Sequence, residues 1–246
     1  MIITSKNNPL IKETATLKEK KGRKQHGSFL VEGIKMSREV QKSGLVLERA
    51  FVSEALANMV DFPKEKTVIV SEAVIRALCD EKTPQGVVCR VKIPTYELAS
   101  PKGACLLLDG VADPGNVGAI IRTANAAGYE EIYLTDDCAD AYSPKSVRAS
   151  MSGVFFTKTY IATRERILRA MENTPIVIAD MHGENVFAFN APQKFALVIG
   201  NEANGVSTQL KNAATHVIKI PMRETQESLN AAVSAGILMY QLKKEI

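Results

Sequence analysis

Hydrophobic and polar positions alternate in a recognisable order between residues 106 and 134. An apolar run at 104–109 has the length of a buried strand, and the proline-glycine turn at 113–115 ends it. Apolar residues then recur at helical spacing from Asn116 onward, and a second apolar run follows at 131–135. The stretch therefore predicts one βαβ unit.

The start of this helix is the first candidate site. Open α/β sheets bind ligands at the carboxyl ends of their parallel strands, so Asn116 and Arg122 are expected beside a ligand. A purely structural turn, in which the glycines only permit tight packing, is the alternative. Gly110, Gly115 and Gly118 do not fit the dinucleotide pattern G-x-G-x-x-G, so a nicotinamide-dependent oxidoreductase is disfavoured.

Two α/β units follow from the remaining pattern. In the second half of the chain, strands are predicted at 104–109, 131–135, 155–160, 176–180, 194–199 and 216–221, with helices between most of them. This alternation predicts a mostly parallel sheet covered on both faces. In the first half, strands are predicted at 29–33, 49–52, 67–70 and 86–91, with helices through Ile34, Met36 and Val40, at 54–59 and at 72–78. The segment 92–103 has the proline and glycine content of a linker, so we expect domains at 1–95 and 100–246, with the boundary near Ala99.

Two further strands are expected to end in small-residue loops. The run 197–199 continues directly into Gly200, Asn201 and Glu202, and the run 218–220 ends at Pro221. If these ends neighbour the end of the 104–109 strand, their loops form a pocket walled by backbone amides and carbonyls. Such a pocket suits an adenosine group.

Positive charge is concentrated at the amino terminus. The chain has a formal net charge of +4, whereas residues 1–44 contain ten Lys or Arg and four Asp or Glu, a local +6 that leaves −2 for the rest. This asymmetry favours an acidic polymer as partner, and a solvated lysine-rich face is the alternative. Gly22 is expected to break a helix and to leave cations on a flexible loop for phosphate contacts. These cations are Lys20, Lys21, Arg23 and Lys24.

Cysteine and histidine spacing argues against disulfides and metal. The cysteines show no C-x-x-C pairing and the histidines are scattered, so we expect reduced thiols and no metal site. The four cysteines are Cys79, Cys89, Cys105 and Cys138. No apolar run approaches the roughly 20 residues of a membrane span, and no signal peptide opens the chain. A cytoplasmic protein without membrane segments is expected.

Three strings of the second half resemble the motifs of the SpoU (TrmH) family of RNA ribose 2′-O-methyltransferases, in the SPOUT superfamily. The strings NVGAIIRTANAAG, LVIGNEANGV and IPMRETQESLNAAVSAGI match in order and spacing across 104–242. Before Pro94, the strings ITSKNNPLIK, FLVEGIK and TPQGVV are similar to the ribosomal-protein-like substrate-binding domain of many members. The resemblance implies a small α/β RNA-binding domain followed by a parallel-sheet domain with a trefoil knot. Hydrophobic pattern alone predicts an ordinary doubly wound sheet.

The resemblance also implies the cofactor, S-adenosylmethionine, and the residues around it. Family cofactor contacts fall on Gly200, Asn201, Glu202, Ile220, Met222, Ser228 and Leu229, and catalytic positions fall on Asn116, Arg122, Ser228 and Asn230. A guanidinium with a pKa above ~12 is a poor base at neutral pH. We therefore expect Arg122 to clamp the target phosphate and to stabilise the developing alkoxide.

Substrate and assembly follow from the same resemblance. A separate amino-terminal domain is associated with ribosomal RNA of the 23S type in this family. A tRNA ribose methyltransferase or a non-catalytic RNA-binding module stays an alternative. The target nucleotide and the general base stay open. It also stays open whether the amino-terminal domain presents RNA to the catalytic domain of its own chain or to that of the other subunit. A homodimer through the helix at 228–242 is expected, since that helix is apolar on more than one side.

Overall fold

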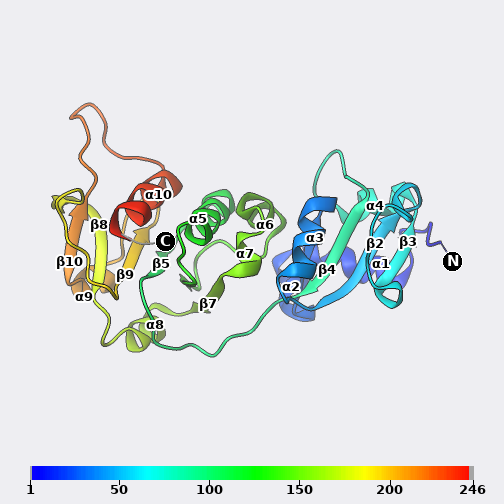
Figure 1. The fold of residues 1–246 in the computed structure, drawn as a ribbon, viewed down its shortest axis with the longest axis horizontal. Coiled ribbons are helices and arrows are strands. Elements are labelled where there is room, and N and C mark those ends of the chain that lie inside the picture. The colour runs from blue at the N-terminus through cyan, green and yellow to red at the C-terminus, as the bar shows by residue number, and fades with distance from the viewer. Residues whose placement is uncertain (1, 244–246) are drawn as a thin grey trace.

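The computed structural model describes residues 2–243 and contains two α/β units joined by an extended segment (Figure 1). The amino-terminal sheet has the order β1-β4-β2-β3, in which β4 is antiparallel to β1 and β2, and β2 is parallel to β3. Its strands are β1 (Ser28–Glu32), β2 (Leu47–Ser53), β3 (Thr67–Val70) and β4 (Val87–Lys92). Its helices are α1 (Pro9–Ala15), α2 (Lys20–His26), α3 (Ile34–Lys42) and α4 (Glu72–Leu78), with 3-10 turns η1 (Thr16–Lys18), η2 (Glu54–Leu56) and η3 (Lys64–Lys66).

The carboxy-terminal sheet is parallel throughout and has the order β10-β8-β9-β5-β6-β7. Its strands are β5 (Cys105–Asp109), β6 (Glu131–Thr135), β7 (Lys158–Ala162), β8 (Ile176–Asn185), β9 (Ala196–Gly200) and β10 (His216–Lys219). Its helices are α5 (Pro114–Ala126), α6 (Pro144–Ser150), α7 (Gly153–Phe156), α8 (Arg164–Ala170), α9 (Thr208–Ala213) and α10 (Ala231–Leu242). The predicted parallel α/β sheet is confirmed. The trefoil knot implied by the resemblance stays a prediction.

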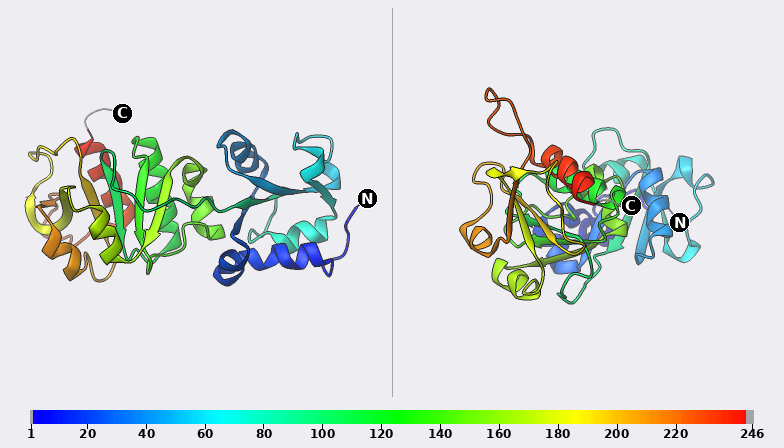
Figure 2. Two further views of the ribbon diagram at one scale, coloured as in Figure 1. Left: turned by 90° about the horizontal axis from the view of Figure 1, so that it is seen from below. Right: turned by 60° about the vertical axis from the view of Figure 1, so that its left-hand side comes forward.

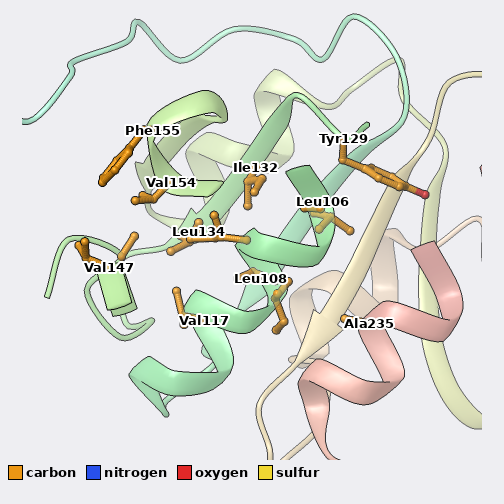
Figure 3. Close-up of a cluster of buried hydrophobic side chains, with 14 of the residues drawn as sticks. Leu106, Leu108, Val117, Tyr129, Ile132, Leu134, Val147, Val154, Phe155 and Ala235 are labelled. Atoms are coloured by element: carbon orange, nitrogen blue, oxygen red, sulfur yellow. The ribbon is translucent and has the colours of Figure 1, made fainter. Parts of the chain in front are cut away.

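Both faces of this sheet are covered. Successive side chains of a strand point to opposite faces, so Leu106 and Leu108 of β5 pack on one face and Leu107 on the other. The first face is covered by α5 and α10, with Val117 and Ala235 in the same cluster as Leu106 and Leu108 (Figure 3). Helices α8 and α9 cover the opposite face. Burial on both faces explains the nearly continuous apolar runs of the central strands.

Several predicted element boundaries are wrong. The run expected as a strand at 155–160 begins as the helical turn α7, and β7 starts only at Lys158. The helix expected at 54–59 is the short turn η2. Helix α10 begins at Ala231, because the Asn230 side chain caps it by accepting from the amides of Ala232 and Val233.

The cluster at residues 20–24 is helix α2, so the prediction of a helix break and a flexible loop there is wrong. Gly22 lies inside the helix, where a Cβ atom would be 2.1 Å from the carbonyl oxygen of Thr16. Glycine is therefore required for close packing of α2 against η1. It does not interrupt the helix.

The two units share an interface with an apolar centre. Phe29 of β1 packs against Tyr142 and Phe155 of the second unit, with ring centroids 5.0 Å and 6.2 Å apart. An ion pair joins Arg23 to Asp140 at 2.7 Å, and Arg148 contacts the carboxylate of Asp80 at 2.6 Å. The extended connection runs along the side of the second sheet (Figure 2). In the sequence, all strands of the first sheet precede the expected boundary near Ala99 and all strands of the second sheet follow it. One buried hydrophobic cluster nevertheless contains residues of both units.

Candidate functional site

The loops after β5 and β9 are tied together at the carboxyl edge of the parallel sheet. The side-chain amide of Asn201 donates from Nδ2 to the carbonyl oxygen of Gly110 at 2.7 Å. Its Oδ1 accepts from the backbone amides of Ala203 and Asn204. All hydrogen-bonding groups of the Asn201 side chain except one N–H are thus used to shape the two loops. Neighbouring strand ends meet here as the sequence predicts.

Glu202 connects the loop after β9 to the start of α5. Its carboxylate accepts from the amides of Ala112 at 3.0 Å and Asp113 at 3.3 Å, and from Nδ2 of Asn116 at 2.8 Å. Burial raises the pKa of Glu202, but these hydrogen bonds outweigh burial and leave the pKa below its ordinary value. The carboxylate is therefore ionised at neutral pH. Its charge lies beside the positive end of the α5 dipole.

Asn116 extends this contact to the third motif. While its Nδ2 donates to Glu202, its Oδ1 accepts from Nδ2 of Asn230 at 3.0 Å. Asn230 in turn caps α10. The three motifs are thus joined through Glu202, Asn116 and Asn230, and we call these residues the Asn-Glu network. Because Asn116 spends its carbonyl oxygen and one amide hydrogen inside this network, it acts mainly as a connector.

A cavity of about 260 Å³ lies next to the network, between the middle of β8, the end of β10 and the start of α10. Four residues expected to contact the cofactor line it together, namely Ile220, Met222, Ser228 and Leu229. Between β10 and α10 the chain forms neither helix nor strand, so most backbone amides and carbonyls of this segment are outside any ladder. Apolar side chains combined with available backbone donors and acceptors fit an adenosine-containing ligand.

The second-motif residues have a different position from the one expected. Gly200, Asn201 and Glu202 are not among the residues that line this cavity. A Cβ atom on Gly200 would lie 2.4 Å from the carbonyl carbon of Gly205, so Gly200 allows the loop to close on itself. Gly205 is the residue of this loop that forms part of the cavity wall. Gly200, Asn201 and Glu202 therefore shape the loop that carries Gly205, and they do not line the cavity themselves.

Asp180 and Met181 also line the cavity, and sequence reasoning did not include them. They lie where β8 shifts register against β10, so that Ile178 and Glu184 pair with consecutive residues of the neighbouring strand. The pKa of Asp180 is lowered, first by the hydrogen bond from the amide of His182. The available signal was a single acidic residue at the expected end of a strand. That signal does not reveal the bulge at which β8 shifts register against β10.

Arg122 is separate from the cavity. It is exposed on α5 and has no hydrogen bond or ion pair with any residue of the described range 2–243. Arg122 follows Asn116 by six positions, which places the two side chains on different sides of a helix with 3.6 residues per turn. The side of α5 that carries Asn116 and Thr123 faces α10, where Gly236 lies near Thr123. The backbone of Arg122 instead lies against Gly153 of α7. Within one chain, Arg122 is not brought to the cavity.

The four cations expected to bind RNA divide into two groups. Lys20, Lys21 and Lys24 are exposed on α2. Arg23 is only 4% exposed and is bound to Asp140 and to two carbonyl oxygens of η1. Its expected role in phosphate binding is corrected by this burial, since its guanidinium is already committed to the domain interface.

The structure also bears on the expectations for metal, thiols and membrane. Within residues 2–243, no group of three or more His, Cys, Asp or Glu side chains is arranged to hold a metal ion. All four cysteines are unpaired and buried. None of the helices in the described part of the chain has the length and apolar character needed to cross a membrane.

Comparison with known families matches both units. A model of the SpoU rRNA Methylase family matches residues 103–240, and a model of the MRM3-like substrate binding domain matches residues 8–89. The 23S rRNA (guanosine(2553)-2′-O)-methyltransferase RlmP of Bacillus subtilis (strain 168) is 31% identical over 255 residues, which cover 98% of both chains.

Solved structures agree with this match. The crystal structure of an AdoMet-bound rRNA methyltransferase from Sinorhizobium meliloti has a TM-score of 0.89 at 28% identity, covering 98% of this chain and 96% of that chain. The SpoU methyltransferase AviRb from Streptomyces viridochromogenes, in complex with the cofactor AdoMet, has a TM-score of 0.82 at 26% identity, covering 96% of this chain and 97% of that chain. Both proteins are similar to this chain over both of its units.

Proposed function

This chain belongs to the SpoU rRNA methylase family, and from that premise we propose that it methylates a ribose 2′-hydroxyl of ribosomal RNA with S-adenosylmethionine as cofactor. The observation that carries the proposal is the cavity formed by Ile220, Met222, Ser228 and Leu229, beside a network that joins all three motifs. Two relatives that align with both units of this chain are named as 23S rRNA 2′-O-methyltransferases.

We assign cofactor binding to this cavity. Ile220, Met222 and Leu229 offer apolar contacts. Asp180 pairs with Lys211 at 3.4 Å, and the charged lining residues Asp180, Glu227 and Lys219 have a formal net charge of −1, which favours a cationic ligand. Gly200, Asn201 and Glu202 support the ligand indirectly, through the loop that carries Gly205. When bound, S-adenosylmethionine supplies a methyl group on a cationic sulfur, and no metal is needed for its transfer. The protein must hold the accepting hydroxyl in line, about 3 Å from that carbon.

The substrate side is assigned to Arg122, Ser228 and Asn230. A free, exposed guanidinium provides a planar donor fork for a phosphate. Because Arg122 is separate from the cavity of its own chain, the Arg122 that stabilises negative charge on the ribose oxygen comes from the second copy in the proposed homodimer. Ser228 lines the cavity, and Asn230, two positions along the chain, keeps one side-chain N–H that the bond to Asn116 does not use. These groups orient the ribose, and Asn116 holds Asn230 in position. Deprotonation through the RNA phosphate or through water is compatible with this arrangement.

A homodimer is part of the proposal. One face of α10 packs into its own subunit through Leu238 and Met239, whereas Val233 and Tyr240 are 51% and 52% exposed. A second copy packed on this face would cover both side chains. Ribosomal RNA as substrate agrees with a cytoplasmic location, which stays a prediction. A tRNA substrate remains the second candidate, because both substrates present the same ribose chemistry.

The test uses the full chain. Calorimetry is expected to detect S-adenosylmethionine binding and no binding of reduced nicotinamides. Leu229→Asp, which introduces a charge into the apolar wall, is expected to abolish cofactor binding, and Lys21→Ala on α2 serves as the distant control. Mapping of 2′-O-methyl groups in total RNA from cells with and without the gene then identifies the target. A missing methyl group in tRNA alone would select the second candidate, and absence of cofactor binding by a folded protein would reject the proposal.

A further inference from the structure

A second cavity, of about 360 Å³, lies between the two units and away from the proposed cofactor cavity. Its walls come from α2, from the connection at residues 93–96, and from β6, β7 and the turn after β6. In Figure 1 the extended connection passes β7 and α8 on its way to β5. Neither the sequence motifs nor the proposed chemistry accounts for this cavity.

One wall of this interdomain cavity carries two free cations. Lys20 and Lys24 lie one helical turn apart on α2 and both line the cavity. Both are exposed, and neither has an ion pair with any carboxylate in the described part of the chain. Arg23 also lines the wall, but Asp140 neutralises it at 2.7 Å. With Asp136 counted as the remaining carboxylate, the lining has three cations and two anions, a net charge of +1.

An aromatic side chain faces the same space from the connection. Tyr96 is 40% exposed and meets the ring of Tyr160 edge-on at 5.9 Å. Tyr160 stacks on Tyr133 at 4.7 Å, and the Tyr133 hydroxyl donates to the carbonyl oxygen of Ala99 at 2.9 Å. The connection is therefore held in place by an aromatic ladder. Tyr96 presents a fixed apolar surface together with Ile161, which is 51% exposed.

The inner wall contains unsatisfied polar atoms. The hydroxyl oxygens of Tyr142 and Thr159 are buried and neither has a hydrogen bond of ordinary length with a described residue. The two side chains interact with each other, and both line the cavity. Buried hydroxyls without a full partner are uncommon in folded proteins, because each loses its hydrogen bonds to water. A polar ligand in the cavity would restore them.

We propose that this interdomain cavity binds one unpaired nucleotide of the RNA substrate. An aromatic surface for a base, two cations for the flanking phosphates and buried hydroxyls for polar base edges are the groups that recognise single-stranded RNA. The carboxylate of Asp136 can accept from an exocyclic amino group of the base. This inference rests on the proposed function, since it requires RNA as substrate.

The position of the cavity fits this role. It lies at the carboxyl end of β6 and beside the middle of β7, whereas the proposed cofactor cavity lies at β8 and β10. All of these strands are parallel, so both cavities open along the same edge of the sheet. Three strand spacings separate β8 from β6, about 14 Å at ~4.8 Å each. One RNA strand can therefore contact both cavities, with a base held a few nucleotides from the methylated ribose.

The test compares variants of the full chain in binding a fluorescein-labelled 12-nucleotide single-stranded RNA of mixed sequence, followed by anisotropy. Tyr96→Ala is expected to weaken binding about tenfold, and Tyr96→Phe, which keeps the ring, to bind as the parent does. Lys20→Ala combined with Lys24→Ala is expected to lower the slope of log affinity against log salt by about 1.5. Lys12→Ala combined with Lys64→Ala removes two exposed lysines of the same unit that do not line the cavity, and this pair is the matched control.

Cofactor binding separates this inference from the proposed function. All variants are expected to bind S-adenosylmethionine as the parent does, because none of the changed residues lines the cofactor cavity. If the parent protein binds cofactor and methylates RNA while Tyr96→Ala equals the parent, the nucleotide site is refuted and the enzyme assignment stands. Equal losses from the Lys12, Lys64 pair and from the Lys20, Lys24 pair would also refute it. Photocrosslinking of a 4-thiouridine RNA to Tyr96 or Ile161 would support the site directly.

Discussion

Replacement of Arg23 by alanine is expected to destabilise the protein, because Arg23 connects three parts of the structure. Its Nε and Nη2 atoms contact Oδ2 of Asp140 at 2.8 Å and 2.7 Å. Its Nη1 atom donates to the carbonyl oxygens of Leu17 and Lys18 at 2.8 Å and 2.7 Å. Without the guanidinium, the Asp140 side chain keeps the amide of Tyr142 as its one donor among residues 2–243, and the carbonyl oxygens of Leu17 and Lys18 lose the Arg23 donor.

The size of the effect follows from burial. Removing one partner of a buried ion pair costs about 3–5 kcal/mol, because the other charge is left without compensation. Arg23 is 4% exposed, whereas the Asp140 side chain is 16% exposed, so water partly solvates the remaining carboxylate. We therefore expect a loss of about 3 kcal/mol in the free energy of unfolding, a large part of the 5–15 kcal/mol typical of a folded protein.

Urea unfolding followed by circular dichroism measures this loss, since the chain contains no tryptophan for fluorescence. Lys24→Ala, the exposed neighbour on the same helix, is the control and is expected to stay within about 0.5 kcal/mol of the parent. A double-mutant cycle with Asp140→Asn isolates the coupling between the two side chains. If Arg23→Ala were as stable as the parent and had lost RNA affinity, Arg23 would be a phosphate ligand and the reasoning from burial would be wrong.

Four further predictions concern the proposed site and the fold. Arg122→Ala and Arg122→Lys are each expected to abolish methylation in a methyl-transfer assay while cofactor affinity by calorimetry stays within a few-fold, and an active lysine variant would contradict the proposed donor fork. Glu202→Gln is expected to lower the free energy of unfolding by about 1 kcal/mol at pH 7, a small value because the side chain is exposed to solvent. Folding lowers the pKa of Glu202, so the stabilisation that its carboxylate provides is complete above the ordinary pKa of 4.5 and is lost as pH falls through the folded pKa. The unfolding free energies of the parent and of Glu202→Gln, measured in urea, are therefore expected to converge in acid. Gly118→Ala is expected to lower the free energy of unfolding by about 1–3 kcal/mol, because the new Cβ atom would lie 2.4 Å from the carbonyl oxygen of Ser146 in α6. Unchanged unfolding in urea would show that α5 and α6 can move apart. Light scattering is expected to give the mass of a dimer at micromolar concentration, and Val233→Lys on α10 to give the 26.8 kDa chain.

The order of strands and helices could be predicted from the sequence because it depends on local patterns. Largely apolar strands such as β5 and β6, which are buried along their whole length, can be stable only when both faces of a sheet are covered, and this requirement indicated a parallel α/β architecture. Ile220, Met222, Ser228 and Leu229 were expected at one site and do line one cavity. Their closeness in sequence after β10 makes that outcome largely a local one.

The remaining features were decided by contacts between distant residues. Asn116 and Asn230 are 114 positions apart, and Arg23 and Asp140 are 117 apart, so no periodicity along the chain specifies either pair. A lysine-rich stretch with a central glycine has the composition of a mobile basic loop. Packing of α2 on η1, which only glycine permits, converted it into a helix and buried one of its four cations. Local hydrophobicity determines which segments are buried, whereas charge pairing and the shape of the interface determine which polar side chains remain available for RNA.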